Sequence, residues 1–175
     1  EIADETDISP GNLHYHFRHK DEIALELFKR YLLALQPLLE VDESAPPSLE
    51  ELHLRLHLVF EAQARYRFLF RDLADLYARI DNLRRAMRGL LGRQSRLLSN
   101  LLQRLEKAGM LRIDTTAAEL LVENILLIMT YWIPHAAVLD EEGLDDGSAV
   151  ARAVAQVLYL LVPYLGAEEG AELEQ

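Results

Sequence analysis

The sequence contains no cysteine, few glycines and few prolines, and each shortage narrows the possible structures and functions. Without cysteine, the chain has no disulfides, thiolate metal sites or cysteine nucleophile, which is compatible with a reducing cytosol. Only 8 glycines and 6 prolines stand among 175 residues rich in Leu, Ala, Glu and Arg, a composition that favours helix over sheet. The sequence also lacks a glycine-rich phosphate loop and a nucleophile elbow, so no pattern indicates an enzyme.

No stretch is typical of a membrane span or a targeting signal. The longest apolar run, residues 125–133, is too short to cross a bilayer and is typical of a buried helix. The N-terminus is charged and has no apolar segment, so we expect no signal peptide and a cytoplasmic location. The net charge of −11 is concentrated in residues 113–175, whereas residues 79–112 are basic, so the acidity does not exclude a DNA partner.

Helical periodicity runs through the chain, and no segment alternates strictly as a half-buried strand does. We therefore expect an all-α fold that includes a helix over residues 21–38 and a linker at residues 44–47. The predicted buried face of that helix consists of Ile23, Leu27, Tyr31 and Leu35.

The later helices carry recognisable start and stop signals. Ser48 and Glu51 form a capping-box pattern, and residues 66–77 are apolar on several sides, which predicts partial burial all round. A long leucine stripe with arginines opposite it extends to Gly109, where a Schellman-type ending is expected. Either Asp114 or Thr116 caps the next helix.

The last two helices are too apolar to be covered by one chain of this size. Residues 120–133 are apolar nearly all round, and the helix over 148–165 repeats the pattern. Self-association would cover the surplus surface. We therefore predict a homodimer through residues 116–136 and 148–165, with a two-fold interface.

Residues 2–17 have the pattern of helix, tight turn, helix. Ser9 is an N-cap residue, and Pro10 stands at the first helical position, where its missing N–H costs nothing. Leu13 and Phe17 face the core at a spacing of four. The outward face is rich in hydrogen-bonding groups, as a recognition helix in a major groove requires. It consists of Gly11, Asn12, His14, Tyr15 and His16.

The string IADETDISPGNLHYHFRHKDEI, residues 2–23, resembles the helix-turn-helix of the TetR family of transcriptional regulators, where it runs into the family's fourth helix. The resemblance begins inside the family's motif, so we expect the family's first helix and basic arm to lie outside these residues. It implies an N-terminal helix-turn-helix followed by a helical ligand-binding and dimerisation domain. We place the DNA-binding region and connecting helix at residues 1–38 and the second domain at residues 39–175.

The resemblance also implies a role for each DNA-facing position. Ser9 and the helix N-terminus would meet a phosphate, and Pro10 and Gly11 would let the backbone approach the groove. Asn12 and His14 would read base edges. Further phosphate contacts are expected from Tyr15, His16 and Lys20.

Family members hold an apolar pocket between their middle helices, and the sequence offers candidates for its lining. Some aromatic and methionine side chains would line it, and a few polar groups would orient a small hydrophobic ligand. These candidates are His57, Tyr66, Phe70, Tyr77, Asn124, Met129 and Trp132. We expect no cofactor.

Other patterns have simpler explanations than a site. His53 and His57 share a helix face, as metal ligands do, but no further ligand is in a matching pattern, so we expect no metal. Asp72 and Asp75 stand among arginines, which indicates salt bridges rather than acid–base catalysis. The arginines of residues 84–107 indicate a solvated face rather than a DNA contact.

The sequence thus predicts a non-enzymatic repressor that binds a palindromic operator in double-stranded DNA and is released by a small molecule. The alternative is a helical small-molecule-binding protein whose DNA-binding motif is vestigial. The absence of Lys and Arg from the full-length N-terminus would favour that alternative.

Overall fold

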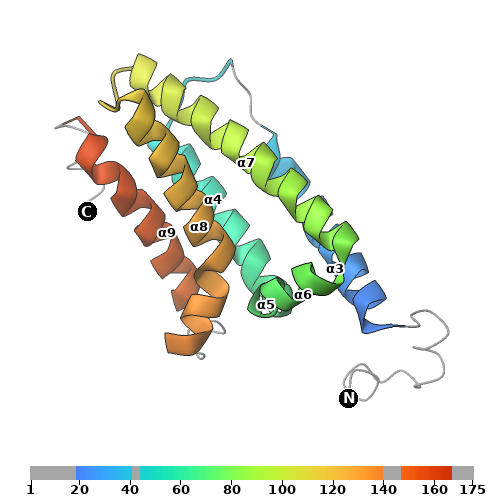
Figure 1. Ribbon diagram of the computed structural model, residues 1–175. Helices are drawn as coiled ribbons and strands as arrows, with labels where there is room; N and C mark the ends of the chain where they lie inside the picture. Colours follow the sequence, from blue (N-terminus) through green and yellow to red (C-terminus); the bar gives the residue numbers. More distant parts are fainter. Residues whose placement is uncertain (1–18, 41–43, 140–146, 167–175) are drawn as a thin grey trace.

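The computed structural model describes residues 19–40, 44–139 and 147–166, and these ranges fold into a bundle of helices (Figure 1). The α-helices in these ranges are α3 (Lys20–Leu35), α4 (Leu49–Arg65), α5 (Arg67–Arg71), α6 (Leu73–Arg79), α7 (Asp81–Lys107), α8 (Thr115–Leu139) and α9 (Ser148–Leu161). Two 3₁₀ helices, η1 (Gln36–Leu39) and η3 (Val162–Tyr164), continue α3 and α9. Strand-type pairing in the described ranges is limited to one antiparallel bridge, between Leu111 and Leu165. The all-α prediction is confirmed; the predicted helix-turn-helix lies outside the described residues.

The helix boundaries follow local signals. The Ser48 hydroxyl accepts a hydrogen bond from the Glu51 amide at 3.3 Å and so caps α4. Asp114, not Thr116, caps α8, because its carboxylate accepts from the Ala117 amide at 2.9 Å. The sequence left these two residues as alternatives.

Gly109 ends α7 in the predicted manner. Its φ of 77° is in the left-handed region that glycine adopts without strain. The Met110 amide donates to the Leu105 carbonyl and the Gly109 amide donates to the Glu106 carbonyl, which together make a Schellman motif.

The helix predicted over residues 21–38 is α-helical only as far as Leu35. Pro37 cannot donate a backbone hydrogen bond, and the chain tightens into η1 from Gln36 onward. The predicted buried face is correct for Tyr31 and Leu35. Ile23 and Leu27 are only partly buried, and the fully buried positions lie in the second half of α3, where Phe28 joins them.

The body is built on α4 and α8, each of which packs against several other helices. Figure 1 shows α8 and α9 side by side at one edge of the bundle and α3 at the other, near the N-terminal end of α7. α4 packs against α9 and α3, and α8 packs against both α7 and α9. Trp132 ties α8 to the start of α9, since its indole N–H donates to the Ala149 carbonyl at 2.8 Å.

Residues 66–77 are not buried on all sides, contrary to the expectation. They form α5 and most of α6, two short helices that bury Leu69, Phe70, Leu73 and Leu76. Phe68 is 43% exposed, because a helix packed on one side leaves its other side in solvent.

The arginine side of α7 is mainly a surface feature, as expected. Arg84 pairs with Asp81, one turn away on the same helix, at 2.6 Å. Two arginines nearer the other end instead reach backbone carbonyls: Arg93 donates to Leu39 at 3.5 Å, and Arg104 donates to Ala45. α7 therefore also fastens the segment that follows α3.

α8 is 25 residues long and apolar, so by length and composition it could cross a membrane, although its longest apolar run is short. It buries Leu121, Val122, Ile125, Met129 and Ile133 in the bundle. A core helix of a soluble protein passes the same test of length and hydropathy, and these contacts account for its buried side.

Candidate functional site

A cavity of about 90 Å³ lies where η1 and the Pro47–Ser48 segment meet α4, α7 and α8. Its walls are mainly leucine, with Val59 and Met129 at the α4 and α8 sides. Gln94, which is 5% exposed, contributes a polar group from α7. A mainly apolar hollow with a small number of polar groups is the usual form of a small-molecule site. Because pockets for drug-sized ligands measure roughly 300–1,000 Å³, such a ligand would have to move these walls.

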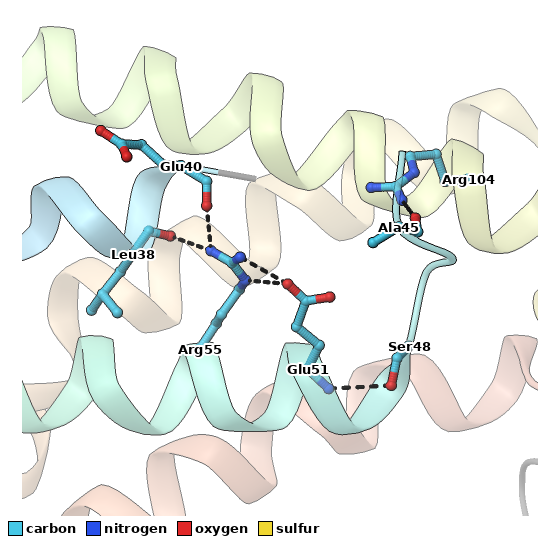
Figure 2. Close-up of polar contacts among 7 residues, drawn as sticks. All are labelled: Leu38, Glu40, Ala45, Ser48, Glu51, Arg55 and Arg104. Carbon is cyan, nitrogen blue, oxygen red and sulfur yellow. Dashed lines mark hydrogen bonds and ion pairs between the residues drawn. The ribbon is translucent and has the colours of Figure 1, made fainter. Parts of the chain in front are cut away.

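Arg55 lines one side of the cavity, which we call its mouth, and Figure 2 shows the contacts that hold Arg55. Its guanidinium donates to the carbonyls of Leu38 and Glu40, both at 2.9 Å, and to the Glu51 carboxylate, also at 2.9 Å. Leu38 belongs to η1, which continues α3 without a break. The mouth is therefore tied directly to the C-terminal end of α3.

Arg104 fixes the other side of the mouth. Its guanidinium reaches from α7 to the Ala45 carbonyl in the linker, and Ser48 caps α4 just beyond (Figure 2). Glu51, whose amide is held by Ser48, uses its carboxylate on Arg55, so the contact from Ser48 is only half of the expected capping box. Both arginines line the cavity, so displacing either one would loosen the segment between α3 and α4.

Beyond the inner wall of the cavity, three helices bring polar side chains together. Gln63 of α4 is 2% exposed, and its amide N–H donates to the Met129 carbonyl of α8 at 2.7 Å. Tyr31 of α3 is completely buried, and Tyr77 of α6 is partly buried. Three buried atoms in this group have no hydrogen-bond partner among the described residues: the Tyr31 hydroxyl, the Tyr77 hydroxyl and the Gln63 Oε1. We call Tyr31, Gln63 and Tyr77 the polar cluster.

Burial dominates the electrostatics of the polar cluster. It raises the pKa of the Tyr31 hydroxyl well above 10, an effect that the neighbouring Gln63 side chain partly offsets. It also raises the pKa of Tyr77, to which the nearby hydroxyls of Tyr131 and Tyr31 add. Both phenols are therefore neutral at physiological pH, and each can donate and accept a hydrogen bond.

Aromatic rings surround Tyr31. Its ring centroid lies 5.2 Å from that of Phe70 and 5.7 Å from that of Tyr66, both in edge-to-face geometry. Phe28 lies 5.9 Å away on the same helix. These rings fix the side chain that α3 contributes to the body.

The structure gathers some of the predicted ligand residues and separates the others. Tyr66, Phe70, Tyr77 and Met129 lie around Tyr31 or Gln63, and Met129 also lines the cavity. The other three lie elsewhere: Asn124 is exposed on α8, Trp132 binds the Ala149 carbonyl, and His57 faces another hollow. Their assignment as ligand-binding residues remains a prediction.

That second hollow, of about 350 Å³, lies between α4 and α9. His53, His57 and Tyr159 are among its lining residues, and much of its wall is exposed. The imidazole of His57 lies 3.6 Å from the Glu61 carboxylate. Among the described residues, no three His, Asp or Glu side chains are grouped as metal ligands.

Only one predicted DNA-binding residue lies in the described ranges. Lys20 is exposed at the first position of α3. Close to it, Asp21 pairs with Arg79, which also binds Asp75 at 3.0 Å. The start of α3 is thereby tied to the end of α6, and the salt bridge predicted for Asp75 is confirmed. The other predicted DNA contacts, Ser9 to His16, lie outside the described residues.

One face of α8 remains apolar and uncovered in the single chain. Leu120, Leu127 and Tyr131 are each at least half exposed, at spacings of seven and four residues, which place them on one side of the helix. We call these three residues the apolar face.

Comparison with known proteins identifies the family. Residues 30–173 match the model of the TetR family, described as bacterial transcriptional repressors. The structure is similar to that of a TetR-family transcriptional regulator from Marinobacter aquaeolei VT8, with 30% sequence identity and a TM-score of 0.85. That similarity covers 99% of this chain and 83% of the other. A comparison with curated protein sequences found no match.

The chain therefore belongs to the TetR family of DNA-binding transcriptional regulators. Members of this family are generally transcription factors rather than enzymes. Two different parts of the sequence support this assignment independently. One is the resemblance at residues 2–23, and the other is the family match over residues 30–173.

Sequence reasoning missed most of the residues that form the cavity. The leucines of α4 and α7 were assigned to the core without distinction, and Arg55 and Arg104 were not singled out. The spacing of Glu51 and Arg55 does indicate an ion pair within α4. The contacts of Arg55 with η1 and of Arg104 with the linker depend on segments distant in the sequence, so no local pattern reveals them.

Proposed function

We propose that this protein is a repressor that binds a palindromic operator as a homodimer and leaves it when a small hydrophobic ligand enters the cavity beside η1. The observation that carries the proposal is the position of that cavity. Arg55 lines this cavity and contacts the segment that continues α3, the helix that follows the predicted recognition helix.

A ligand would act by favouring one arrangement of α3. The cavity is too small for a drug-sized ligand, so binding would push on η1 and on the contacts made by Arg55 and Arg104. Movement of η1 moves α3, and with it the spacing of the two recognition helices. A ligand that binds better to the arrangement with the wrong spacing shifts the population away from DNA.

Dimerisation would place the two recognition helices about one turn of DNA apart. The apolar face supports an interface formed by residues 116–136 and 148–165 of both copies. Ser9, Pro10, Gly11, Asn12, His14, Tyr15, His16 and Lys20 would form the DNA contact of each copy. As a DNA-binding regulator, the protein would act in the cytoplasm.

DNA binding is tested with the full-length protein and the DNA upstream of its own gene, by fluorescence anisotropy. We expect tight, salt-dependent binding to a palindrome. Replacing Tyr15 or Lys20 should weaken binding to all sequences alike, whereas Asn12→Ala should change the preference between sequences. Failure of the full-length protein to bind would favour the alternative of a ligand-binding protein with a vestigial motif.

Ligand binding is tested separately with N-phenyl-1-naphthylamine, a neutral hydrophobic fluorophore. Leu98 lines the cavity, so Leu98→Trp should fill it and abolish the fluorescence increase. The control is Leu54→Trp, because Leu54 is 59% exposed on α4 and lies outside the cavity lining. Equal fluorophore binding by both variants would contradict the cavity as the ligand site.

A further inference from the structure

The polar cluster lies one helical turn beyond the inner end of the cavity. Val59 lines the cavity and Gln63 follows it at a spacing of four residues on α4, so both side chains point to the same side of the helix. Met129 belongs to both places: it lines the cavity, and its carbonyl accepts the Gln63 amide. Methionine side chains are flexible and adapt to irregular spaces, so Met129 is the lining residue best able to move when a ligand extends from the cavity toward the cluster.

The cluster contains an excess of unused hydrogen-bonding capacity. No hydrogen bond of normal geometry reaches the two tyrosine hydroxyls or the Gln63 Oε1 among the described residues, although the Gln63 side chain lies next to the Tyr31 hydroxyl. Nearly all buried polar groups in proteins have a partner, so three such atoms in one place call for an explanation. Two of them can donate and all three can accept, and none carries a charge.

We propose that the polar cluster is the inner end of the ligand site and receives an uncharged hydrogen-bonding group, such as a hydroxyl, at the end of an apolar ligand. This inference rests on the proposed function and specifies the class of ligand. The leucine-lined cavity covers the apolar part of the ligand, and Tyr31, Gln63 and Tyr77 bind its polar end.

The geometry sets the size and charge of the ligand. Leu52 near the mouth and Gln63 are eleven residues apart on α4, which corresponds to roughly 16 Å along the helix. A linear molecule of about that length spans the site. A carboxylate in place of the hydroxyl is disfavoured, because an ion would lose its hydration among neutral groups.

The position of Tyr31 gives this contact a regulatory consequence. Tyr31 is the member of the cluster that belongs to α3, and Phe70 and Tyr66 pack against its ring. A ligand group bound to its hydroxyl therefore contacts the same helix whose continuation, η1, lines the cavity.

The test compares three linear compounds in competition with N-phenyl-1-naphthylamine. They are 1-dodecanol, the apolar 1-chlorododecane and the charged dodecanoate. We expect 1-dodecanol to bind about 10-fold more tightly than either of the others, the range that a buried hydrogen-bonding group contributes. Equal binding of 1-dodecanol and 1-chlorododecane, or no displacement by 1-dodecanol, would overturn the proposal.

Variants then locate the effect. Tyr31→Phe and Tyr77→Phe remove only a hydroxyl and keep the ring, and each should reduce the preference for 1-dodecanol to about 2-fold while leaving 1-chlorododecane unaffected. The matched control is Tyr159→Phe, an exposed tyrosine outside the cluster, which should keep the full preference. If the preference persists in both cluster variants, the cluster holds only water and the proposal is wrong.

These outcomes are distinguishable from failure of the proposed function. If Leu98→Trp abolishes fluorophore binding but 1-dodecanol is not preferred, the cavity remains the ligand site and the inference about the polar cluster is wrong. Fluorophore binding that is unchanged in Leu98→Trp contradicts the cavity itself. DNA binding is measured without any of these compounds and is independent of both.

Discussion

α7 and α8 are the two longest helices described, and they differ in how their surfaces are used. α7 buries one stripe and exposes arginines, so its contacts within one chain account for its whole sequence pattern. α8 buries Ile125 and its neighbours and yet exposes Leu120, Leu127 and Tyr131. Neighbouring helices cover the apolar stripe of α7, whereas α8 has a second apolar side that the single chain does not cover. The difference supports the proposal that α8, rather than α7, forms the dimer interface.

The largest expected effect is on dimerisation. Leu127→Glu would place a charge in the centre of the apolar face of both copies, and we expect the dimer dissociation constant to rise roughly 1000-fold, or about 4 kcal/mol. Analytical ultracentrifugation measures the change. Leu54→Glu, at an equally exposed leucine of α4, is the control and should remain dimeric. If Leu54→Glu were monomeric and Leu127→Glu remained dimeric, the interface would involve α4 rather than the apolar face of α8.

The second effect separates the two sides of α8. Ile125, two residues from Leu127, is 1% exposed, and Ile125→Ala should lower the free energy of unfolding by about 3 kcal/mol through the cavity it creates. Urea denaturation in the Leu127→Glu background measures this without a contribution from dimer dissociation. A change below about 1 kcal/mol would show that this side of α8 is not the core side.

The third effect concerns the start of α8. Asp114→Ala removes the side chain that accepts the Ala117 amide and should cost about 1 kcal/mol of unfolding free energy. Thr116→Ala is the matched control, since Thr116 makes no cap, and its effect should be a few tenths of a kcal/mol at most. The reverse order of the two variants in thermal denaturation would assign the cap to Thr116.

The smallest effect is expected on the arginine side of α7. Arg84 and Asp81 are both largely exposed, so Arg84→Ala should change the free energy of unfolding by less than about 0.5 kcal/mol. Sedimentation should show an unchanged dimer. A loss of dimerisation in this variant would mean that α7 contributes to the interface and that the contrast between the two helices is wrong.

The sequence by itself determined the features that depend on neighbouring residues. Caps at Ser48 and Gly109 are local hydrogen-bond patterns, and the helical periods of α4 and α7 follow from the spacing of their apolar residues. The family resemblance at residues 2–23 is also local. Each of these was predictable because the interacting groups are separated by only a few residues in the chain.

Tertiary packing decided the rest. Periodicity alone could not show that Phe28 would be buried more fully than Leu27, because that depends on which part of α3 meets the body. It could not distinguish Ile125 from Leu127 on a helix that is apolar nearly all round. Nor could it show that Gln63 would meet Met129 from 66 residues away or that Arg55 would hold η1, because those contacts exist only once the helices have packed.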